Sequence, residues 1–506
     1  MNISMLLEMS AESFPDRVAL TVGEVSMTYA ELLVAANAAA GHTASGNYDV
    51  LGFLGVNSLA VPIALFGAAL AGVPYVPMNY RLTRPELEDL LARISPALLV
   101  ANRTIADALT PPTGIKMVSE ESFLALASRS DKHAHPKSVN SERVAVQLFT
   151  SGTTGKPKAA ILRHKNLVSY ILETVEFGAA DEEDATLISV PPYHVAGISA
   201  VLSSTYACRR MVQLPNFDAA EWLRLCARER ITNAFLVPTM LSRIVDHLVA
   251  THTKPNLPQL RAVAYGGGKM PLSVIERAMD MFPNVEFTNA YGLTETSSTI
   301  CLLGPEDHRL SAASDEPAIR KRMISVGKPI GSVEIEIRDE SGARLGRDQS
   351  GDIFVRGSQV SGEYLGVGSL LDDDGWFATR DKGYVDRDGY VFLEGRADDV
   401  IVRGGENISP GEIEDILLEH PAVREVAVVA VPDEQWGETV GAAVVVGEGA
   451  SVAKPELQNW VKTHLRSSRV PAHILFVDEL PFNEMGKIMR RTVKETLRQY
   501  IEKDGR

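Results

Sequence analysis

The sequence predicts an α/β protein: a large N-terminal domain of parallel sheets flanked by helices, a small β-rich subdomain, and a small α+β C-terminal domain. Before Val326, apolar strand patterns alternate with helical patterns, which is typical of a mostly parallel sheet covered on both faces. From Val326 the apolar residues follow the strand period. After a boundary at 395–402, helix and strand patterns fill about 110 residues, an ordinary domain size. The expected domains are residues 1–394 and 395–506.

Length and composition narrow the class of protein. A chain of 506 residues is too long for a single core, and 45% hydrophobic with 23% charged residues is typical of a soluble globular protein. The net charge of −15 argues against nucleic acid or an anionic membrane as the main partner. Cys208, Cys226 and Cys301 form no CxxC pair and no disulfide framework, which indicates a reducing cytoplasm.

The N-terminal part reads as ordinary globular structure. Its first 16 residues lack the basic start and apolar stretch of a signal peptide. Residues 51–80 carry no charge and raise the question of a membrane span, but prolines and glycines divide the run into a strand, a buried helix and a strand. Further helices are expected from residue 27 and near 86–93, and residues 119–141 read as an irregular surface connection.

Residues 149–158, FTSGTTGKPK, follow a strand-like run and suit phosphate binding. Their glycines let backbone N–H groups turn toward phosphate oxygens, and hydroxyl and ammonium groups add donors and positive charge. The spacing excludes a P-loop, because only two residues separate the glycines and Pro157, which has no N–H, follows Lys156. The expected nucleotide-binding residues here are Thr150, Ser151, Gly152, Thr153, Thr154, Gly155 and Lys158.

Beyond this loop a helix is expected around Leu167–Ile171, followed by strands that each end in a Pro- or Gly-rich turn. Ligands of open parallel sheets bind beyond the carboxyl ends of the strands, where these turns fall. One turn is the glycine run Gly266, Gly267 and Gly268, which we expect to approach a nucleotide. The expected strands are 185–190, 234–237, 262–265 and 285–288.

The stretch TSGTTGKPK at 150–158 resembles the nucleotide loop of the adenylate-forming superfamily, which comprises acyl- and aryl-CoA synthetases, adenylation domains and luciferases. The resemblance extends from Thr28 to Arg491. It implies three subdomains in the large domain and a mobile small domain. It also implies a two-step ligase reaction: a carboxylate attacks the α-phosphate of Mg-ATP to give an acyl-adenylate and pyrophosphate, and a thiol then displaces AMP. The implied cofactors are ATP, Mg²⁺ and coenzyme A.

Residues 289–296, NAYGLTET, match a second motif of the superfamily. The resemblance implies that Tyr291 stacks on the purine, that Thr294 donates to a phosphate, and that Glu295 holds Mg²⁺, which prefers one or two carboxylates plus substrate phosphates. The structural alternative is a strand-to-helix turn with a satisfied Glu. The expected nucleotide contacts are Asn289, Ala290, Tyr291 and Gly292, and the expected catalytic residues are Thr294 and Glu295.

Three further matches complete the implied active site. In GWFATRD, Asp381 would bind both ribose hydroxyls, but Arg380 occupies the usual Gly position, so its side chain either crowds the ribose or points to solvent. In the hinge-like 395–401, Arg396 would contact ribose and Asp398 would change its backbone torsions, or the two would form a surface ion pair. Lys487 would bridge the substrate carboxylate and the α-phosphate as the catalytic lysine.

The acceptor and acid sites have weaker signatures. Superfamily members that form CoA thioesters line the thiol channel with a glycine pair, here Gly404 and Gly405, and Arg81 and Arg469 fall where some relatives contact CoA phosphates. His194 matches a gate beside the acyl pocket, with a core histidine as the alternative. The expected CoA-binding residues are Arg403, Gly404, Gly405, Arg81 and Arg469; the expected acyl pocket is His194, Gly197, Ile198 and Phe235, with His194 also counted as catalytic.

Several functional alternatives stay open at this stage. An acyl-CoA ligase is favoured, acting on a fatty, aryl or polycyclic acid, with an adenylating enzyme that loads an acyl-carrier protein as the main alternative. The segment Pro191–His194 has no acid to hold a substrate amine, which disfavours an amino acid. A luciferase-like activity and a nucleotide-binding protein without catalysis are further alternatives, and the intact Lys487, Glu295 and Lys158 argue against the latter. A homodimer is left open.

Overall fold

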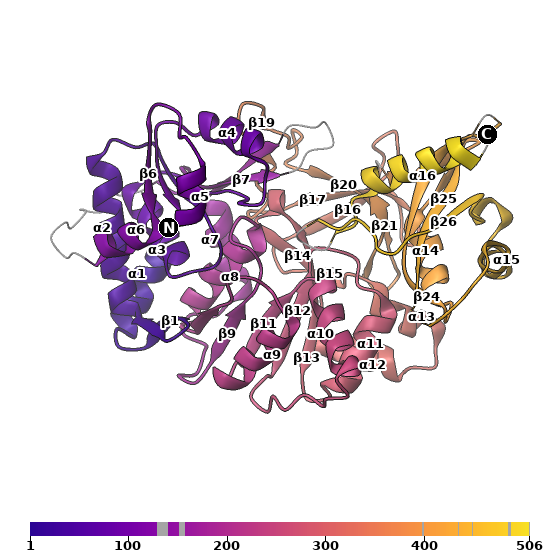
Figure 1. Ribbon diagram of the computed structural model, residues 1–506, viewed down its shortest axis with the longest axis horizontal. Helices are drawn as coiled ribbons and strands as arrows, with labels where there is room; N and C mark the ends of the chain where they lie inside the picture. The colour runs from indigo at the N-terminus through magenta and orange to yellow at the C-terminus, as the bar shows by residue number, and fades with distance from the viewer. Residues whose placement is uncertain are drawn as a thin grey trace.

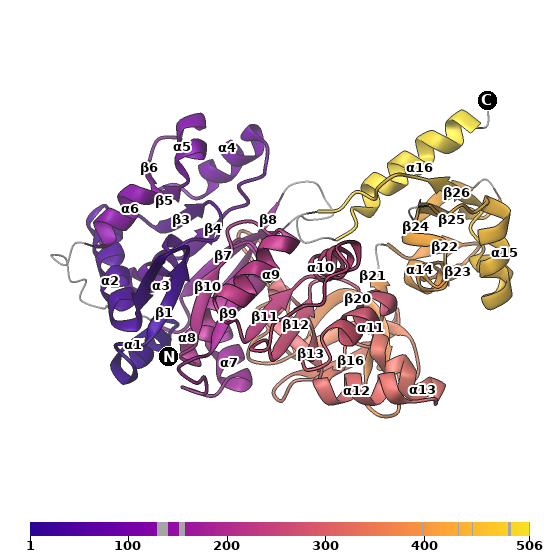
Figure 2. The same cartoon turned by 60° about the horizontal axis from the view of Figure 1, so that its bottom comes forward.

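The computed structural model describes residues 1–128, 140–150, 157–396, 399–433, 435–447, 449–483 and 487–504. The chain forms a large body and a smaller C-terminal one, which lies at the right of Figure 1. A second view shows the small body set beside the large one, with β21 (Val391–Arg396) at the junction (Figure 2). This strand ends two residues beyond the expected domain boundary.

The first sheet of the large body is parallel in its centre, as the sequence predicts. Its strand order is β19-β18-β8-β7-β4-β3-β5-β6, and only β8, β18 and β19 pair antiparallel. The strands are β3 (Val50–Leu54), β4 (Tyr75–Pro77), β5 (Ala97–Ala101), β6 (Ile115–Ser119), β7 (Val144–Thr150), β8 (Lys158–Arg163), β18 (Glu363–Tyr364) and β19 (Gly368–Ser369). The helices around it are α1 (Ser4–Ser13), α2 (Tyr29–Ser45), α3 (Ala60–Ala71), α4 (Arg84–Arg93), α5 (Arg103–Ala108) and α6 (Glu120–Ala127).

Two segments of this region form the elements that the sequence predicts. Helix α2 begins after Thr28, whose hydroxyl accepts from the N–H of Glu31 at 3.2 Å while the Glu31 carboxylate accepts from the Thr28 N–H at 2.8 Å. The uncharged run 51–80 forms β3, the fully packed α3 and β4. Within the ranges that the structure describes, no helix is both long and apolar enough to cross a membrane.

The second sheet contains the Pro- and Gly-rich strand ends. Its order is β15-β14-β13-β12-β11-β9-β10-β1-β2, parallel from β13 to β1. Its strands are β1 (Val18–Val22), β2 (Val25–Thr28), β9 (Ala185–Ile188), β10 (Arg210–Gln213), β11 (Asn233–Leu236), β12 (Ala262–Gly266), β13 (Glu286–Leu293), β14 (Ser298–Leu303) and β15 (Lys328–Pro329). Its neighbours are α7 (His164–Thr174), α8 (Val195–Tyr206), α9 (Ala219–Arg228), α10 (Pro238–Ala250), α11 (Leu272–Met281), α12 (Pro305–Ala313), α13 (Pro317–Arg320) and the short turns η1 (Thr294–Thr296) and η2 (Lys321–Ile324).

One apolar core joins the two sheets. It contains α8 residues such as Ile198 and Leu202 together with Met211 of the second sheet and Leu148 of the first. Helices α9, α10 and α11 cover the opposite face of the second sheet, where Trp222 and Tyr265 are buried. The carboxyl ends of β11 and β12 therefore lie on a rigid base, which positions the turns that follow them.

The β-rich subdomain and the small domain also follow the predicted patterns. The subdomain is an antiparallel sheet of order β16-β17-β20-β21, and the small domain has the order β23-β22-β25-β24 with β26 beside β25. The subdomain strands are β16 (Glu334–Arg338), β17 (Gly351–Arg356), β20 (Phe377–Val385) and β21. The small domain contains β22 (Ile401–Arg403), β23 (Glu406–Ile408), α14 (Pro410–Leu418), β24 (Val423–Asp433), β25 (Gly437–Val446), α15 (Lys454–His464), η4 (Ser467–Arg469), β26 (His473–Phe476) and α16 (Arg490–Asp504).

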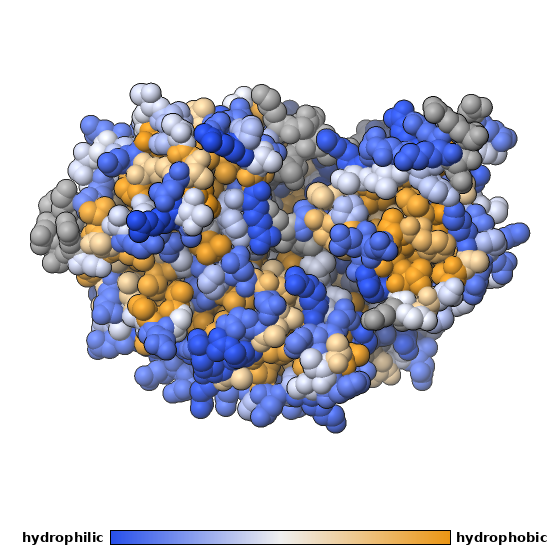
Figure 3. Space-filling view, in the orientation of Figure 1, coloured by the Kyte–Doolittle hydropathy of each residue, from blue (hydrophilic) through white to orange (hydrophobic). Residues whose placement is uncertain are grey.

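The small domain has an apolar core on each face of its sheet. Helices α14 and α15 cover Val426 and Val428 on one face, and α16 covers Val429 and Val431 on the other. Apolar surface also gathers on its visible side below α16, and the molecular outline is notched between the two bodies (Figure 3). No core cluster of the described residues contains side chains from both bodies.

Three local expectations were wrong. Residues 120–127 form helix α6 rather than irregular structure, because the Ser119 hydroxyl accepts from the Ser122 N–H at 3.2 Å and caps it. Strand β13 continues through residues 289–292 instead of ending before them, because β14 turns back and pairs with them. The sequence Ser409-Pro410-Gly411-Glu412 has the pattern of a capping box, but Ser409 does not cap α14, because its hydroxyl donates to the Glu394 carbonyl oxygen instead.

The large and small bodies meet through polar contacts. The Lys269 ammonium, just after the glycine run, lies 2.7 Å from the Asp415 carboxylate and donates to the Gly411 carbonyl at 3.1 Å. The hydrogen bond from Ser409 to Glu394 adds a second connection at the junction. Partly exposed ion pairs of this kind contribute at most about 1 kcal/mol. The relative orientation of the bodies is therefore held by weak, reversible interactions.

We expect Lys269→Ala to lower the population of this orientation by up to about fivefold, the equivalent of about 1 kcal/mol. Energy transfer between dyes on one engineered surface cysteine in each body would measure it, because the native Cys208, Cys226 and Cys301 are buried. Lys165→Ala is the matched control, since the Lys165–Glu142 ion pair has the same 2.7 Å length but lies within the large body. Equal transfer in both variants would contradict the prediction.

Candidate active site

The centre of the site is a carboxylate held by two side chains from different strands. The Tyr291 hydroxyl on β13 donates to Asp381 Oδ2 on β20 at 2.5 Å, and Arg396 Nε on β21 lies 3.2 Å from Asp381 Oδ1. Burial, and then the Asp381 charge, raise the pKa of Tyr291 well above its usual range, so the phenol keeps its proton and stays a donor. The two residues expected at the ribose, Asp381 and Arg396, are thus brought together with Tyr291, which was expected at the purine.

These contacts change the expected part of Tyr291. Its side chain is only 9% exposed and packs in the core of the β-rich subdomain. In this arrangement its hydroxyl positions Asp381, and stacking on a purine stays a prediction. Asp381 itself is 8% exposed, and a carboxylate has lone pairs beyond the two that these contacts use. It can therefore still accept hydrogen bonds from a cis diol.

A bulge in β20 aims Asp381 into the site. Along this edge Asp352 of β17 pairs with Lys382 and Phe354 with Ala378, so residues 379–381 oppose a single residue. The Thr379 hydroxyl donates to the Ile353 carbonyl at 2.8 Å and accepts from the Asp381 N–H at 3.1 Å. Bulges of this kind re-aim side chains next to functional sites. The middle residue of the bulge is Arg380.

Arg380 adopts the left-handed conformation that explains why glycine is usual at this position. Its φ is +61°, a region in which an L side chain places Cβ against the following carbonyl oxygen. The side chain is exposed, while the neighbouring Asp381 is buried. The structure therefore favours the second expectation for Arg380, a side chain that does not crowd the ribose end.

A second cluster forms around Glu295, the expected Mg²⁺ ligand. The Tyr364 hydroxyl on β18 donates to Glu295 Oε1, and the Glu295 carbonyl accepts from the Ser361 and Gly362 N–H groups at 2.9 and 3.0 Å. The Lys158 ammonium lies 5.9 Å from the Tyr364 ring centre. Burial and the Glu295 charge raise the pKa of Tyr364, so it too remains a donor. Tyr364 was not identified from the sequence; its only signal is an aromatic residue in a short hairpin.

The Glu295 carboxylate fits a magnesium ion that is shared with a substrate. Its Oε2 makes no hydrogen bond to the part of the chain that the structure describes, so one oxygen remains for a cation. Among the same residues, no group of three or more His, Cys, Asp or Glu side chains could form a protein-only metal site. Mg²⁺ usually binds through one or two carboxylates plus substrate phosphates, which matches this donor set.

Lys487 comes from the small domain, and its charge interacts with the Asp381–Arg396 pair. Its backbone N–H donates to Asn483 Oδ1 at 2.8 Å, which holds the start of the C-terminal segment 487–504. Partial burial, and then the Arg396 guanidinium, lower the pKa of Lys487, while Asp381 and Asp399 oppose that shift. The side chain still reaches water, so the shift is smaller than for an enclosed lysine.

Arg490, at the start of α16, anchors this segment. Its guanidinium forms a 2.6 Å hydrogen bond to Glu414 on α14 and another of 2.6 Å to the Val428 carbonyl. It also lies 3.5 Å from Asp399, next to the expected hinge. Burial raises the pKa of Asp399 despite this neighbour. This network connects α16 with α14, β24 and Asp399, and no local pattern in the sequence indicates it.

At some of the strand ends only glycine fits, because a neighbouring strand's backbone lies where a Cβ would be. A Cβ on Gly266 would lie 2.1 Å from the Ala290 carbonyl oxygen, and one on Gly292 would lie 1.8 Å from the Ser298 carbonyl oxygen. Gly267 has a φ of +85°, whereas a Cβ on Gly268 would meet only Pro238 at 3.8 Å. Gly266 and Gly292 therefore serve β-sheet packing, and nucleotide contacts by Asn289, Ala290 and the glycines stay predictions.

The expected acyl-pocket residues divide into two groups. Ile198 is fully buried in the core between the sheets, and a Cβ on Gly197 would lie 2.9 Å from the Pro191 carbonyl, so both serve packing in this conformation. Phe235 is partly exposed on β11. His194 precedes α8 with its Nε2 buried and without a hydrogen-bond partner in the described ranges, and burial lowers its pKa to about 4. His194 is therefore neutral near pH 7, and its role at the gate stays a prediction.

The expected CoA-binding residues make contacts outside the Asp381 and Glu295 clusters. Gly404 and Gly405 have φ values of +58° and +83°, and a Cβ on Gly404 would lie 2.6 Å from the exposed Trp436. Arg469 forms ion pairs with Glu406 and Glu412, and Arg403 donates to the Ser468 carbonyl at 3.3 Å. Arg81 Nε donates to the Tyr80 hydroxyl at 3.2 Å. Binding of CoA by these residues stays a prediction.

Several expected residues fall outside the description. These are Ser151, Gly152, Thr153, Thr154 and Gly155 of the phosphate loop and the expected hinge Asp398. The flanking residues are described: β7 ends at Thr150, β8 begins at Lys158, and the Thr150 hydroxyl donates to the Lys158 carbonyl at 3.3 Å. Both ends of the loop therefore start from one antiparallel pair, next to the Tyr364–Glu295 cluster.

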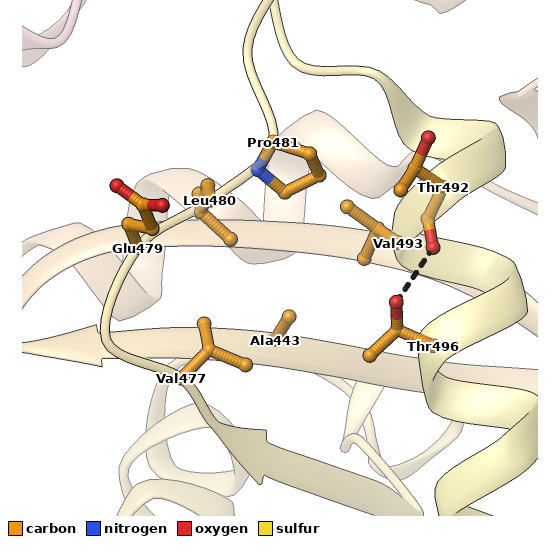
Figure 4. Close-up of a pocket in the computed structure, with 8 residues that line it drawn as sticks. All are labelled: Ala443, Val477, Glu479, Leu480, Pro481, Thr492, Val493 and Thr496. Carbon is orange, nitrogen blue, oxygen red and sulfur yellow. Dashed lines mark hydrogen bonds between the residues drawn. The ribbon is translucent and has the colours of Figure 1, made fainter.

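A small pocket lies elsewhere, under α16 in the small domain. It has a volume of about 180 Å³ and opens between β25 and the segment before Lys487 (Figure 4). Ligand sites usually measure about 300–1,000 Å³, and no residue expected at the active site lines this pocket. We therefore place the candidate site at the two clusters. The lining residues are Ala443, Val477, Glu479, Leu480, Pro481, Thr492, Val493 and Thr496.

Comparison with protein families identifies the fold and the site together. The family model for AMP-binding enzymes matches residues 7–365, which is more than half of the chain. The chain belongs to the AMP-binding enzyme family. The model for the AMP-binding enzyme C-terminal domain matches residues 412–487, which end at Lys487. These matches confirm the predicted superfamily.

Curated relatives span nearly the whole chain. A fatty acid–[acyl-carrier-protein] ligase, ScoC of Streptomyces coeruleorubidus, is 32% identical over 467 residues, covering 88% of this chain and 86% of its own. A feruloyl-CoA synthase of an Amycolatopsis species is 32% identical over 492 residues, covering 96% of each. With the family matches, these relatives confirm the predicted enzyme class, an AMP-forming acid–thiol ligase.

A solved structure confirms the fold class. The o-succinylbenzoate CoA synthetase MenE of Bacillus subtilis, in complex with ATP and a magnesium ion, superposes with a TM-score of 0.81. It is 27% identical, and the match covers 97% of this chain and 99% of that one. The ligands in that structure agree with the predicted cofactors ATP and Mg²⁺.

We expect Arg380→Gly to raise the stability of the large domain by about 1 kcal/mol. It removes a left-handed L residue, which costs about 1–2 kcal/mol, and part of that gain is offset by the extra flexibility of glycine in the unfolded chain. Calorimetry should show a higher Tm for the transition of this domain. Arg387→Gly is the control, because Arg387 lies in the turn after β20 without a positive φ. A lower Tm for Arg380→Gly would contradict the inference that the left-handed backbone of Arg380 is strained.

We expect activation of the acid substrate to decline at high pH with an apparent pKa below the ordinary lysine value of about 10.4. The charged ammonium of Lys487 is the form that attracts phosphate, and partial burial with Arg396 lowers its pKa, so it loses its proton earlier as pH rises. Arg396→Gln should move this alkaline limb to higher pH. The measurement is the pH profile of single-turnover pyrophosphate release; a limb that Arg396→Gln leaves unmoved would contradict the assignment.

Proposed function

We propose that the protein is an AMP-forming acyl-CoA ligase, which activates a carboxylic acid as its adenylate and transfers the acyl group to coenzyme A. The observation that carries the proposal is the Asp381 carboxylate, which the Tyr291 hydroxyl and Arg396 hold at 2.5 and 3.2 Å at the junction with the small domain. The charge of Lys487, from the small domain, interacts with the same pair, which supports its expected role near the group that would hold the ribose. The Glu295–Tyr364–Lys158 cluster supplies the second, phosphate-binding end.

The residues have distinct parts in the first step. Asp381, positioned by Tyr291 and Arg396, accepts the ribose hydroxyls, while Thr294, Lys158 and the loop 150–155 bind the phosphates. Glu295 would hold Mg²⁺, which neutralises charge on the phosphates and the leaving pyrophosphate. Lys487 stabilises the negative charge that develops where the carboxylate meets the α-phosphate. Positioning and charge stabilisation, rather than acid–base chemistry, supply the rate enhancement.

The second step requires another arrangement of the domains, 1–394 and 395–506. Lys487 occupies the site in the first step, whereas a thiol must reach the same adenylate past Gly404 and Gly405. We infer a rotation about Asp398, which would break the Lys269–Asp415 ion pair and the Ser409–Glu394 hydrogen bond. Arg469 would exchange its pairs with Glu406 and Glu412 for CoA phosphates, and Arg81 and Arg403 would add charge.

The main alternative is an enzyme that loads an acyl-carrier protein. The relative ScoC favours it, because that protein is named for a carrier-protein ligase. The feruloyl-CoA synthase, which the match covers more fully, favours coenzyme A. The acid is proposed to be fatty, aryl or polycyclic, since a neutral His194 and the partly exposed Phe235 offer no charge to a substrate. Three buried, unpaired cysteines fit the predicted cytoplasmic location.

A pyrophosphate-release screen over fatty, aryl and polycyclic acids, with coenzyme A, with an acyl-carrier protein and with neither, tests the function. We expect release that depends on Mg-ATP and an acid, and thioester formation with coenzyme A. Lys487→Ala should slow adenylate formation by about 100-fold or more, in the range of lost transition-state charge stabilisation, yet still convert supplied acyl-adenylate.

Lys494→Ala on α16 is the matched control, because Lys494 pairs with Glu438 within the small domain, 3.6 Å away. It should leave both steps within about twofold, a difference of about 0.4 kcal/mol. Loss of both half-reactions in Lys487→Ala would overturn the role of Lys487. Acyl transfer to the carrier protein alone would favour the alternative acceptor.

A further inference from the structure

The acidic side chains of the candidate site do not neutralise all of its basic side chains. The whole chain carries −15, yet no ion pair joins Lys158, Arg380 or Lys487 to the residues that the structure describes. The acids nearby are already engaged: Asp381 contacts Arg396 and Tyr291, and Glu295 accepts from Tyr364. Such a local surplus of cations indicates a polyanionic ligand. Lys158 and Lys487 are residues that the superfamily motifs lead us to expect, whereas Arg380 stands where its motif usually has glycine.

The bulge in β20 determines where Arg380 lies. Residues 379–381 oppose one residue of β17, and the bulge buries Thr379 and Asp381 while it exposes the Arg380 side chain between them. The left-handed φ of +61° is required for this arrangement. A strained residue persists where its surroundings determine its conformation, and such residues gather at ligand sites. Arg380 is thus held beside Asp381 with its guanidinium available to a ligand.

The surroundings of Arg380 indicate which end of the nucleotide it faces. The start of β20 packs against the segment that leads to Tyr364, because a Cβ on Gly362 would lie 2.9 Å from Phe377 and the Gly362 N–H donates to the Glu295 carbonyl. Of the two arginines beside Asp381, Arg380 acts more strongly than Arg396 on Tyr364, and Lys158 lies over the same ring at 5.9 Å. The ribose end is already supplied with Arg396, which contacts Asp381 at 3.2 Å and donates to the Thr379 carbonyl at 3.0 Å. Arg380 therefore belongs with the phosphate-binding cluster rather than with the ribose contacts.

We propose that Arg380 is a further substrate-binding residue, which contacts the β- and γ-phosphates of ATP and the pyrophosphate that leaves. The proposal rests on the proposed function of this site and adds a ligand contact at a position where a glycine has no side chain. A guanidinium suits this part, because its planar array of donors matches phosphate oxygens and it stays charged at any physiological pH.

The test compares nucleotides that differ only in the phosphates that Arg380 would contact. We expect Arg380→Gln to raise the Kd of Mg-ATP and the inhibition constant of inorganic pyrophosphate about tenfold, or about 1.4 kcal/mol. The Kd of AMP should stay within twofold, because AMP lacks both phosphates. Calorimetric titration with each probe needs no acid substrate and no acceptor.

Three variants separate charge from backbone strain. Arg380→Lys should retain most of the ATP affinity, since it keeps a cation. Arg380→Gly should lose as much ATP affinity as Arg380→Gln while it raises Tm, which shows that the folded site is intact. Arg387→Gln is the matched control. Arg387 is 88% exposed in the turn at the far end of the β20–β21 hairpin, so its substitution should change the affinity for neither ATP nor AMP.

The outcomes decide the proposal. An unchanged Kd for Mg-ATP in Arg380→Gln would overturn it. An equal loss of affinity for ATP and for AMP would also overturn the proposal and would indicate that Arg380 contacts the ribose or the α-phosphate. If the wild type binds Mg-ATP but releases no pyrophosphate with any acid, the proposed function is wrong. The effect of Arg380→Gln on the ratio of ATP to AMP affinity still tests the proposed phosphate contact in that case.

Discussion

The hydrogen bond from Tyr291 to Asp381 is the interaction on which the rest of the site depends. It joins the last parallel strand of the second sheet to the β-rich subdomain, and Arg396 continues the contact into the strand that leads to the small domain. Loss of this bond would leave a buried carboxylate with one partner, which is costly in a low-dielectric interior. The positions of β13, β20 and the domain junction are therefore coupled through one carboxylate.

Around that carboxylate the site separates into two regions with different physical tasks. The Asp381 region is buried and neutral overall, which suits the recognition of sugar hydroxyls by fixed acceptors. The Glu295 region contains Lys158 and, as proposed, Arg380; Glu295 and Lys158 are partly exposed to water and Arg380 is exposed. Screening weakens each exposed charge, so several cations together are needed to hold a polyanion. The small domain adds Lys487, whose charge interacts with Asp381 and Arg396.

The sequence predicted the parts of this site that chemistry restricts to few residue types. The hydroxyl- and glycine-rich loop has a composition that suits phosphate binding, and resemblance to the superfamily pointed to Tyr291–Glu295, Asp381 and Lys487, whose roles stay predictions. Contacts between distant residues were not found: Tyr364 reaches Glu295 over 69 positions, and Lys269 reaches Asp415 over 146. Ser409 and β13 were misassigned because tertiary partners, the Glu394 carbonyl and strand β14, outweighed local signals.

The two-sided core of the small domain has a consequence for its motion. Because α14 and α15 cover one face of its sheet and α16 the other, the domain would carry its own apolar interior with it in the proposed rotation. The contacts described at the junction are polar, and water can replace each of them as it opens. Rotation then requires little wetting of apolar surface, so its free-energy barrier should vary more with ionic strength than with temperature.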